Sequence, residues 1–262
     1  MEDTASASFD RDAAVSAFLA ARETRTWLTA LPEGSKPQTA GQSEAIRDEI
    51  VRRLGAVAAW KVGAASAEAT PFRGAINPST LFVDTTSLPA NVFNLIGVEA
   101  EIAVRFAKDL PAREAPYGKD EVLAAIGSVH PAFEICDTRF AQWASQEPLS
   151  HQADQLNHGA LIIGAAGAMT PASLADHDFG AQPVVLELNG ETAVDKAGGN
   201  VAVDLVRLLV WMANEGARAF GGLKAGQYVT TGSYTGTIFV EPGTRARAEF
   251  SGIGAIELTL TA

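Results

Sequence analysis

The first part of the chain carries a hydrophobic pattern that is typical of amphipathic helices. Apolar residues recur at helical spacing over residues 9–30 and again over residues 40–54. They are Ala14, Phe18 and Ala21 in the first stretch, and Ile46, Ile50 and Val51 in the second. Asp10 is a typical N-cap for the first helix, and Gly55 is a typical C-cap for the second. The segment LPEGSKPQT between them predicts a loop.

From about residue 59 onward, short strand-like runs replace the helical pattern. The segment GVEAEIAVRFA (97–107) alternates with period two, as a β-strand does. The pattern also predicts helices over 118–129 and Val201–Phe220, and a hairpin that turns at Asn189-Gly190. We therefore expect an α+β protein, with a helical N-terminal segment (1–58) followed by a mixed, mostly antiparallel β-sheet domain (59–262).

Composition narrows the functional class. The 262 residues include 20 basic and 31 acidic ones, a net charge of −11, which disfavours binding to nucleic acid or to anionic membranes. No apolar run approaches the roughly 20 residues that cross a bilayer. Cys136 is the single cysteine, so no intramolecular disulfide can form. The polar start MEDTASASFDRDA lacks the pattern of a signal peptide, and a cytoplasmic protein is expected.

Three carboxylates stand out as candidate chemistry. Glu99 and Glu101 are two residues apart in a strand, so they project from the same face about 6–7 Å apart. Glu134 lies in the apolar strand HPAFEICD, where an ionised carboxylate needs a partner. The spacing alone is compatible with two interpretations: a solvated acidic face with a separate ion pair, or an oxygen-rich site for Mg²⁺ or Mn²⁺. The first is slightly favoured by the pattern itself.

The order of motifs along the chain resembles the fumarylacetoacetate hydrolase superfamily. The resemblance is greatest to its 2-hydroxypenta-2,4-dienoate hydratase and 4-oxalocrotonate decarboxylase group. It extends over nearly the whole chain and rests on several segments that occur in the family's order. These are AWKVGA, GVEAEIAVRFAKDLP, HPAFEICDTRFAQW, ADQLNHGALIIG, GGLKAGQYVTTGSYTG and VEPGTRARAEFSGIGAIELTL. The resemblance implies that Glu99, Glu101 and Glu134 bind Mg²⁺ or Mn²⁺, and that Lys61 reaches the active site as a catalytic residue.

One segment departs from the family pattern. Hydratases of the group carry a Pro-Asp-aromatic-Gly segment whose Asp acts together with the Lys, whereas this chain has Pro71-Phe72-Arg73-Gly74. Arg73 is either a clamp for a substrate carboxylate or an exposed loop residue, and the sequence favours neither. Thr231 and Ser233, in a Thr-Gly-Ser segment, match the family segment that contacts the substrate carboxylate.

The resemblance implies a metal-dependent hydratase that adds water to a 2-hydroxy-2,4-dienoate in the catabolism of aromatic-type compounds. The alternatives are a decarboxylase of a 4-oxalocrotonate-like 2-oxo diacid, a C–C hydrolase of an acylpyruvate, and a non-catalytic binder of 2-oxo acids. The hydrolases use a His-Glu pair on a lid, and residues 9–55 contain no histidine. Family members are usually homo-oligomers, so a homo-oligomer acting on a small 2-oxo acid is expected.

Overall fold

The computed structural model describes residues 9–262, so the predicted N-terminal segment is described from residue 9 onward. Residues 1–8, on which the absence of a signal peptide was partly argued, lie outside the described residues. The helices are α1 (Arg11–Thr24), α2 (Ala40–Leu54), α3 (Lys119–Leu123), α4 (Pro148–Ala153) and α5 (Leu205–Trp211). No helix in the described part of the chain is long and apolar enough to span a membrane.

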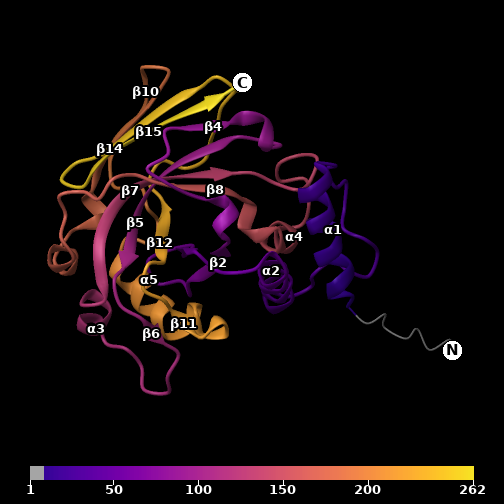
Figure 1. Cartoon of the computed structure of the whole chain (residues 1–262), viewed down its shortest axis with the longest axis horizontal. Helices are drawn as coiled ribbons and strands as arrows, with labels where there is room; N and C mark the ends of the chain where they lie inside the picture. Colours follow the sequence, from indigo (N-terminus) through magenta and orange to yellow (C-terminus); the bar gives the residue numbers. More distant parts are fainter. Residues whose placement is uncertain (1–8) are drawn as a thin grey trace.

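Two mixed sheets form the body of the molecule (Figure 1). Their strands are β1 (Ala59–Gly63), β2 (Phe72–Ile76), β3 (Leu81–Val83), β4 (Ser87–Pro89), β5 (Gly97–Phe106), β7 (Ile126–Cys136), β8 (His158–Ile163), β9 (Pro183–Leu188), β10 (Glu191–Ala197), β12 (Tyr228–Ser233), β13 (Ile238–Phe239), β14 (Arg245–Phe250) and β15 (Gly254–Thr261). The first sheet runs in the order β2-β1-β12-β5-β7-β8-β3, and β13 also pairs with β5. The second runs β10-β9-β14-β15-β4, and a small ribbon pairs β6 (Leu110–Pro111) with β11 (Gly222–Leu223).

Most strand pairs are antiparallel. The exceptions are β1 with β12, β3 with β8, and β4 with β15. Long buried strands at the centre of the first sheet, β5 and β7, pair over almost their whole length. The predicted α+β class, with helices first and a mixed sheet afterwards, is confirmed.

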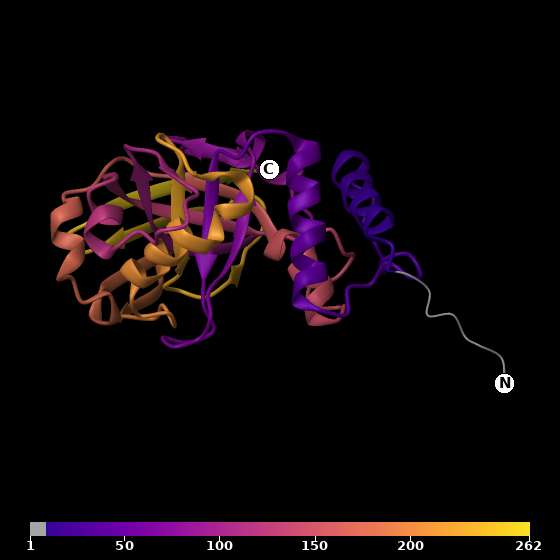
Figure 2. The same cartoon turned by 90° about the horizontal axis from the view of Figure 1, so that it is seen from below.

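The N-terminal helices stand beside the sheets as a separate layer, with α2 between α1 and the sheet body (Figure 2). This layer has its own core, which includes residues that lie much later in the chain. Its buried members are Ala14, Val15, Phe18, Leu31, Ile46, Ile50, Phe140 and Ala153. Because Phe140 and Ala153 belong to the segment that leaves β7 and forms α4, the helical layer is built from more than residues 9–58.

Capping residues in the sequence correctly predicted some of the helix ends. The Asp10 side chain accepts a hydrogen bond from the Ala13 amide, α2 spans the predicted residues, and Gly55 follows it with φ +111°. The first helix is nevertheless shorter than predicted, because Arg25 takes a left-handed conformation and ends it. The hairpin turn is confirmed, with positive φ at both Asn189 and Gly190.

Two predicted helices were wrong in extent. The helix expected over 118–129 ends at Leu123, and the chain enters β7 at Ile126. The one expected over Val201–Phe220 begins only at Leu205, because the Asp204 side chain caps it by accepting from the Arg207 amide. It continues into a π-helical turn (η6, Met212–Gly216) and a 3₁₀ turn (η7, Arg218–Phe220).

Candidate active site

Strand pairing brings the three predicted carboxylates together. Glu99 of β5 lies directly opposite Glu134 of β7, and Glu101 follows two residues along on the same face. One oxygen from each carboxylate lies within 4.8 Å of one from each of the others. Glu101 and Glu134 are buried. The interpretation of Glu99 and Glu101 as a solvated acidic face is therefore contradicted by the burial of Glu101, and the three side chains form the carboxylate cluster that a metal site requires.

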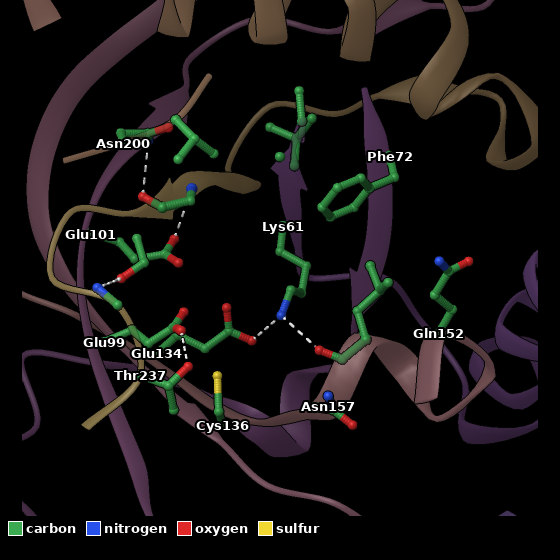
Figure 3. A pocket seen from close by; sticks show the side chains of 18 of the residues that line it. Lys61, Phe72, Glu99, Glu101, Glu134, Cys136, Gln152, Asn157, Asn200 and Thr237 are labelled. Carbon is green, nitrogen blue, oxygen red and sulfur yellow. Dashed lines mark hydrogen bonds and ion pairs between the residues drawn. The ribbon is translucent and has the colours of Figure 1, made fainter. Parts of the chain in front are cut away.

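Lys61 of β1 reaches the cluster from the neighbouring part of the same sheet (Figure 3). Its Nζ lies 2.5 Å from Glu134 Oε1 and 3.2 Å from the carbonyl oxygen of Leu156. His158 Nδ1 lies 3.0 Å from the same Glu134 oxygen, while its Nε2 lies 3.1 Å from Thr80 Oγ1. Since a carboxylate only accepts, Nδ1 carries the proton and Nε2 accepts from Thr80. Glu134 is thus fixed from two sides.

The other two carboxylates are held by short polar side chains and one backbone amide. Glu101 Oε2 accepts from the Thr230 hydroxyl and, at 3.1 Å, from the Gly232 amide. Glu99 accepts from the Thr237 hydroxyl. These partners fix both carboxylates without neutralising their charge.

The electrostatics show an excess of negative charge. Burial, reinforced by Glu134 and Glu99, raises the pKa of Glu101 to about 8. Burial and then repulsion from Glu134 also raise the pKa of Glu99. Burial alone would raise the pKa of Glu134, but Lys61 and the hydrogen bond from His158 outweigh it and lower that pKa. Lys61 itself is held protonated, because the attraction of Glu134 outweighs burial and raises its pKa.

This donor set fits a hard divalent cation. Three carboxylates offer oxygen ligands in one place, and a single ammonium group offsets only one of their charges. The raised pKa values of Glu99 and Glu101 express the repulsion that a bound cation would remove. Glu99, Glu101 and Glu134 are therefore the residues that would hold Mg²⁺ or Mn²⁺.

The cluster lines a cavity of about 580 Å³. Lys61, Ser233 and the three glutamates line this cavity, as the sequence predicted they would line one site. The remaining wall is largely apolar or carries amides. It includes Val62, Ala64, Phe72, Trp143, Pro148, Val201, Gln152, Asn157 and Asn200. Apart from Lys61, no Lys or Arg within residues 9–262 lines it.

Arg73 neither lines this cavity nor lies exposed in a loop, so both roles considered for it from the sequence, the carboxylate clamp and the exposed loop residue, were wrong. Its guanidinium is buried against α2, where it forms a two-pronged ion pair with Asp48. Its Nε donates to the Gly216 carbonyl at 2.9 Å, and Glu44 lies 2.8 Å from its Nη2. Neighbouring residues of a strand face opposite ways, so Phe72 points into the cavity where Arg73 points away from it.

Thr231 is likewise turned away from the cavity. It is buried, and its hydroxyl donates to the Ile102 carbonyl at 2.7 Å, so it stabilises the strand pair and does not line the cavity. Ser233 faces the cavity instead. Its Oγ accepts from the amides of Thr235 and Gly236, which leaves its own hydroxyl proton free.

Sequence reasoning missed His158, Asn157 and Asn200. His158 and Asn157 occur in the family-like segment ADQLNHGALIIG, but only the fold shows that their side chains reach Glu134 and the cavity. Asn200 donates to the carbonyls of Thr231 and Gly232 and so holds the Thr-Gly-Ser turn in place. A signal for it exists in Gly198-Gly199, which both have positive φ and allow the chain to approach that turn closely.

Comparison with known proteins places this geometry in a family. The 2-keto-4-pentenoate hydratase of Paraburkholderia xenovorans is 27% identical over 186 residues, which are 71% of this chain and 66% of the relative. The 4-oxalocrotonate decarboxylase of Pseudomonas putida is 31% identical over 159 residues, which are 61% of this chain and 58% of the relative. The matched part of this chain thus spans 66% of the first relative and 58% of the second, less than two thirds of either.

The fold is shared with solved structures. The 4-oxalocrotonate decarboxylase from Pseudomonas putida G7, solved with magnesium and adipate, superposes with a TM-score of 0.79 at 24% identity. That match covers 97% of this chain and 99% of the other. The family model described as fumarylacetoacetate (FAA) hydrolase, C-terminal, matches residues 53–261. The chain is therefore a member of the fumarylacetoacetate hydrolase superfamily, related to 2-keto-4-pentenoate hydratases and 4-oxalocrotonate decarboxylases.

Proposed function

We propose that this protein is a divalent-metal-dependent hydratase that adds water to a 2-hydroxy-2,4-dienoate or its 2-oxo-4-enoate tautomer. The observation that carries the proposal is the convergence of Glu99, Glu101 and Glu134 beside Lys61 in one partly buried cavity. The relation to hydratases of small 2-oxo acids supports it.

A bound Mg²⁺ or Mn²⁺ would supply a Lewis acid for the 2-oxygen and carboxylate of such a substrate. Lys61 serves as a charged hydrogen-bond donor rather than a base, because its raised pKa keeps it protonated at neutral pH. An ammonium group has three N–H donors, and Glu134 and Leu156 occupy two of them. The third is available to hydrogen-bond a substrate oxygen on which negative charge develops.

Ser233 would hold the substrate carboxylate. Because its oxygen accepts two backbone N–H groups, its O–H is the group that remains to be donated, and it faces the cavity. The Gly232 amide is unavailable, since it donates to Glu101. Asn200 keeps this turn in position through two hydrogen bonds to its carbonyls.

The charge of the cavity favours a substrate with one carboxylate. The cavity wall away from the glutamates carries aromatic, aliphatic and amide groups and the His151 ring, but no Lys or Arg besides Lys61 within the described residues. A second carboxylate would have to leave water without a charged partner, which is costly. This observation favours the hydratase over a decarboxylase of a 2-oxo diacid, which is the alternative that the relatives support.

The remaining expectations extend the same proposal. We infer that the protein acts in the cytoplasm, as a homo-oligomer, in the breakdown of aromatic-type compounds. A C–C hydrolase is not favoured, because the histidines that line the cavity or contact the cluster, His151 and His158, are already held by Asn157 and Glu134. A non-catalytic binder is not favoured either, because it would not require a buried, mutually repelling carboxylate cluster.

The test is turnover of 2-hydroxypenta-2,4-dienoate and of 2-oxohex-3-enedioate, followed by ultraviolet absorbance and by CO₂ release. Wild type, Glu101→Gln and the exposed control Glu114→Ala are compared with Mg²⁺ and with EDTA. We expect Mg²⁺-dependent loss of the dienoate without CO₂, abolished in Glu101→Gln and unchanged in Glu114→Ala. Release of CO₂ from the diacid would establish the decarboxylase instead, and no turnover of either would contradict both.

A further inference from the structure

The turn that follows α4 has an unusual backbone. Gln155, Leu156 and Asn157 (η3) have φ values of 46°, 55° and 58°, so three successive non-glycine residues adopt the left-handed conformation. Each such residue costs on the order of 1 kcal/mol or more, and runs of them are rare. The conformation directs the Leu156 carbonyl to Lys61 and sets Asn157 in the cavity wall. Strained backbone of this kind is retained where it positions functional groups.

A chain of hydrogen bonds determines which way the Asn157 amide faces. The backbone N–H of Gln146 points at His151 Nε2, 3.2 Å away, and a backbone amide can only donate. Nε2 is therefore the acceptor, so the proton of the neutral ring is on Nδ1. Nδ1 lies 3.2 Å from Asn157 Oδ1 and donates to it. The ring is also held in place by edge-to-face packing against Phe140, at 5.2 Å between centroids.

It follows that the amide nitrogen of Asn157 is the free end. Its Nδ2 has no hydrogen-bond partner among residues 9–262 and is not among their fully buried, unsatisfied atoms, so it has accessible surface. Asn157 lines the cavity, and Figure 3 shows its nitrogen turned toward the interior and its oxygen turned away. The Asn157 side chain therefore presents N–H donors, and not its carbonyl oxygen, to the cavity.

We propose that Asn157 is a specificity-determining residue that donates its amide N–H to an oxygen of the substrate remote from the glutamate cluster. His151 is its positioning residue. The inference rests on the proposed function, because it takes the substrate to be a 2-oxo acid anchored at the cluster. The acceptor is either a hydroxyl oxygen, as in the hydrated product, or a carboxylate oxygen, as in a diacid, and the experiment distinguishes these two.

The experiment is isothermal titration in Mg²⁺ with three ligands that differ only at the far end. They are 2-oxopentanoate, 4-hydroxy-2-oxopentanoate and 2-oxohexanedioate. We expect the wild type to bind one oxygenated ligand roughly ten-fold more tightly than 2-oxopentanoate, the usual effect of one good hydrogen bond. Asn157→Gly, which tolerates the left-handed backbone, should lose that preference and leave the affinity for 2-oxopentanoate unchanged.

Further variants separate the two acceptors and the role of His151. If the preferred ligand is the diacid, Asn157→Asp should weaken its binding further, because a carboxylate there accepts and repels. If it is the hydroxy acid, Asn157→Asp should retain part of the preference, since a hydroxyl can donate to Asp. His151→Phe should reduce the preference, because the phenyl ring cannot accept from Gln146 or donate to Asn157 and so no longer orients the Asn157 amide. His151→Gln should restore it, because one amide can both accept from Gln146 and donate to Asn157.

Two results would overturn the inference. One is a wild type that binds all three ligands equally, and the other is an Asn157→Gly variant that keeps the wild-type preference. Failure of 2-oxopentanoate to bind the wild type in Mg²⁺ is a different result, because it contradicts the proposed function on which the inference rests. Thermal unfolding of each variant checks that it is folded before it is titrated.

Discussion

Glu101 couples the charge of the site to the stability of the chain. In the metal-free protein burial and two neighbouring carboxylates raise its pKa from 4.5 to about 8. Between these values the folded state binds a proton that the unfolded state has lost, so stability falls as pH rises. Buried His158, whose pKa falls from 6.5 to about 4, acts in the opposite direction but only below pH 6.5. Between pH 6.5 and 8 the effect of Glu101 on stability can therefore be measured without a contribution from His158.

We expect the free energy of unfolding in EDTA to decrease by roughly 1–2 kcal/mol between pH 6.5 and 8. Glu101→Gln, which cannot ionise, should remove most of this decrease. Urea unfolding of both proteins at several pH values measures the difference. Equal slopes for the two proteins would show that another group carries the pH dependence.

The ion pair of Arg73 with Asp48 is expected to stabilise the fold without taking part in substrate binding. Asp48→Asn leaves a buried guanidinium with a weaker partner, and Glu44 compensates only in part because its own side chain is half-exposed. We expect a loss of roughly 3 kcal/mol in unfolding free energy, with kcat/KM within two-fold of wild type. The double variant Asp48→Leu with Arg73→Met should recover much of the stability. A fall in kcat/KM at unchanged stability would indicate that Arg73 contributes to substrate binding instead.

At the scale of elements, the features that could be predicted are those that depend only on residues close together in the sequence. The caps at Asp10 and Gly55 and the Asn189-Gly190 turn are local, and each was placed correctly. The carboxylate cluster followed from one strand's alternation together with the family resemblance. The role of Arg73 could not be predicted, because its partner Asp48 belongs to α2 and only the packing of α2 against β2 brings the two side chains together. The π turn was missed because the apolar spacing over Val201–Phe220 predicts one continuous helix and does not show how side chains pack within it.

Gly216 illustrates that packing. In the π turn a Cβ at this position would lie 2.8 Å from a ring atom of Trp211 and 2.4 Å from Met212 Sδ. We expect Gly216→Ala to cost roughly 1–2 kcal/mol, because the methionine can shift but the ring is constrained. Gly41→Ala in α2 is the matched control, since only Thr39 Oγ1 lies within 4 Å, and a helical Ala should stabilise slightly. Stabilisation by both changes would contradict the packing argument.

For the whole molecule, the proposed cation site lies where it can act on global stability. The carboxylates belong to β5 and β7, the central pair of the larger sheet, and Lys61 ties β1 to the same point. A ligand that binds only the folded state at 100 times its Kd stabilises by about 2.7 kcal/mol. For a chain of 262 residues this corresponds to a rise in Tm of roughly 5–10 °C.

We therefore expect saturating Mg²⁺ to raise the Tm of the wild type by about that amount relative to EDTA. The same addition should leave Glu101→Gln nearly unchanged, because the variant lacks one ligand. Both proteins carry a strongly negative net charge, so non-specific screening by the salt would shift them equally. A control in NaCl at the same ionic strength measures the screening effect by itself. A shift of the same size in both proteins would mean that the three carboxylates do not bind the cation as a unit.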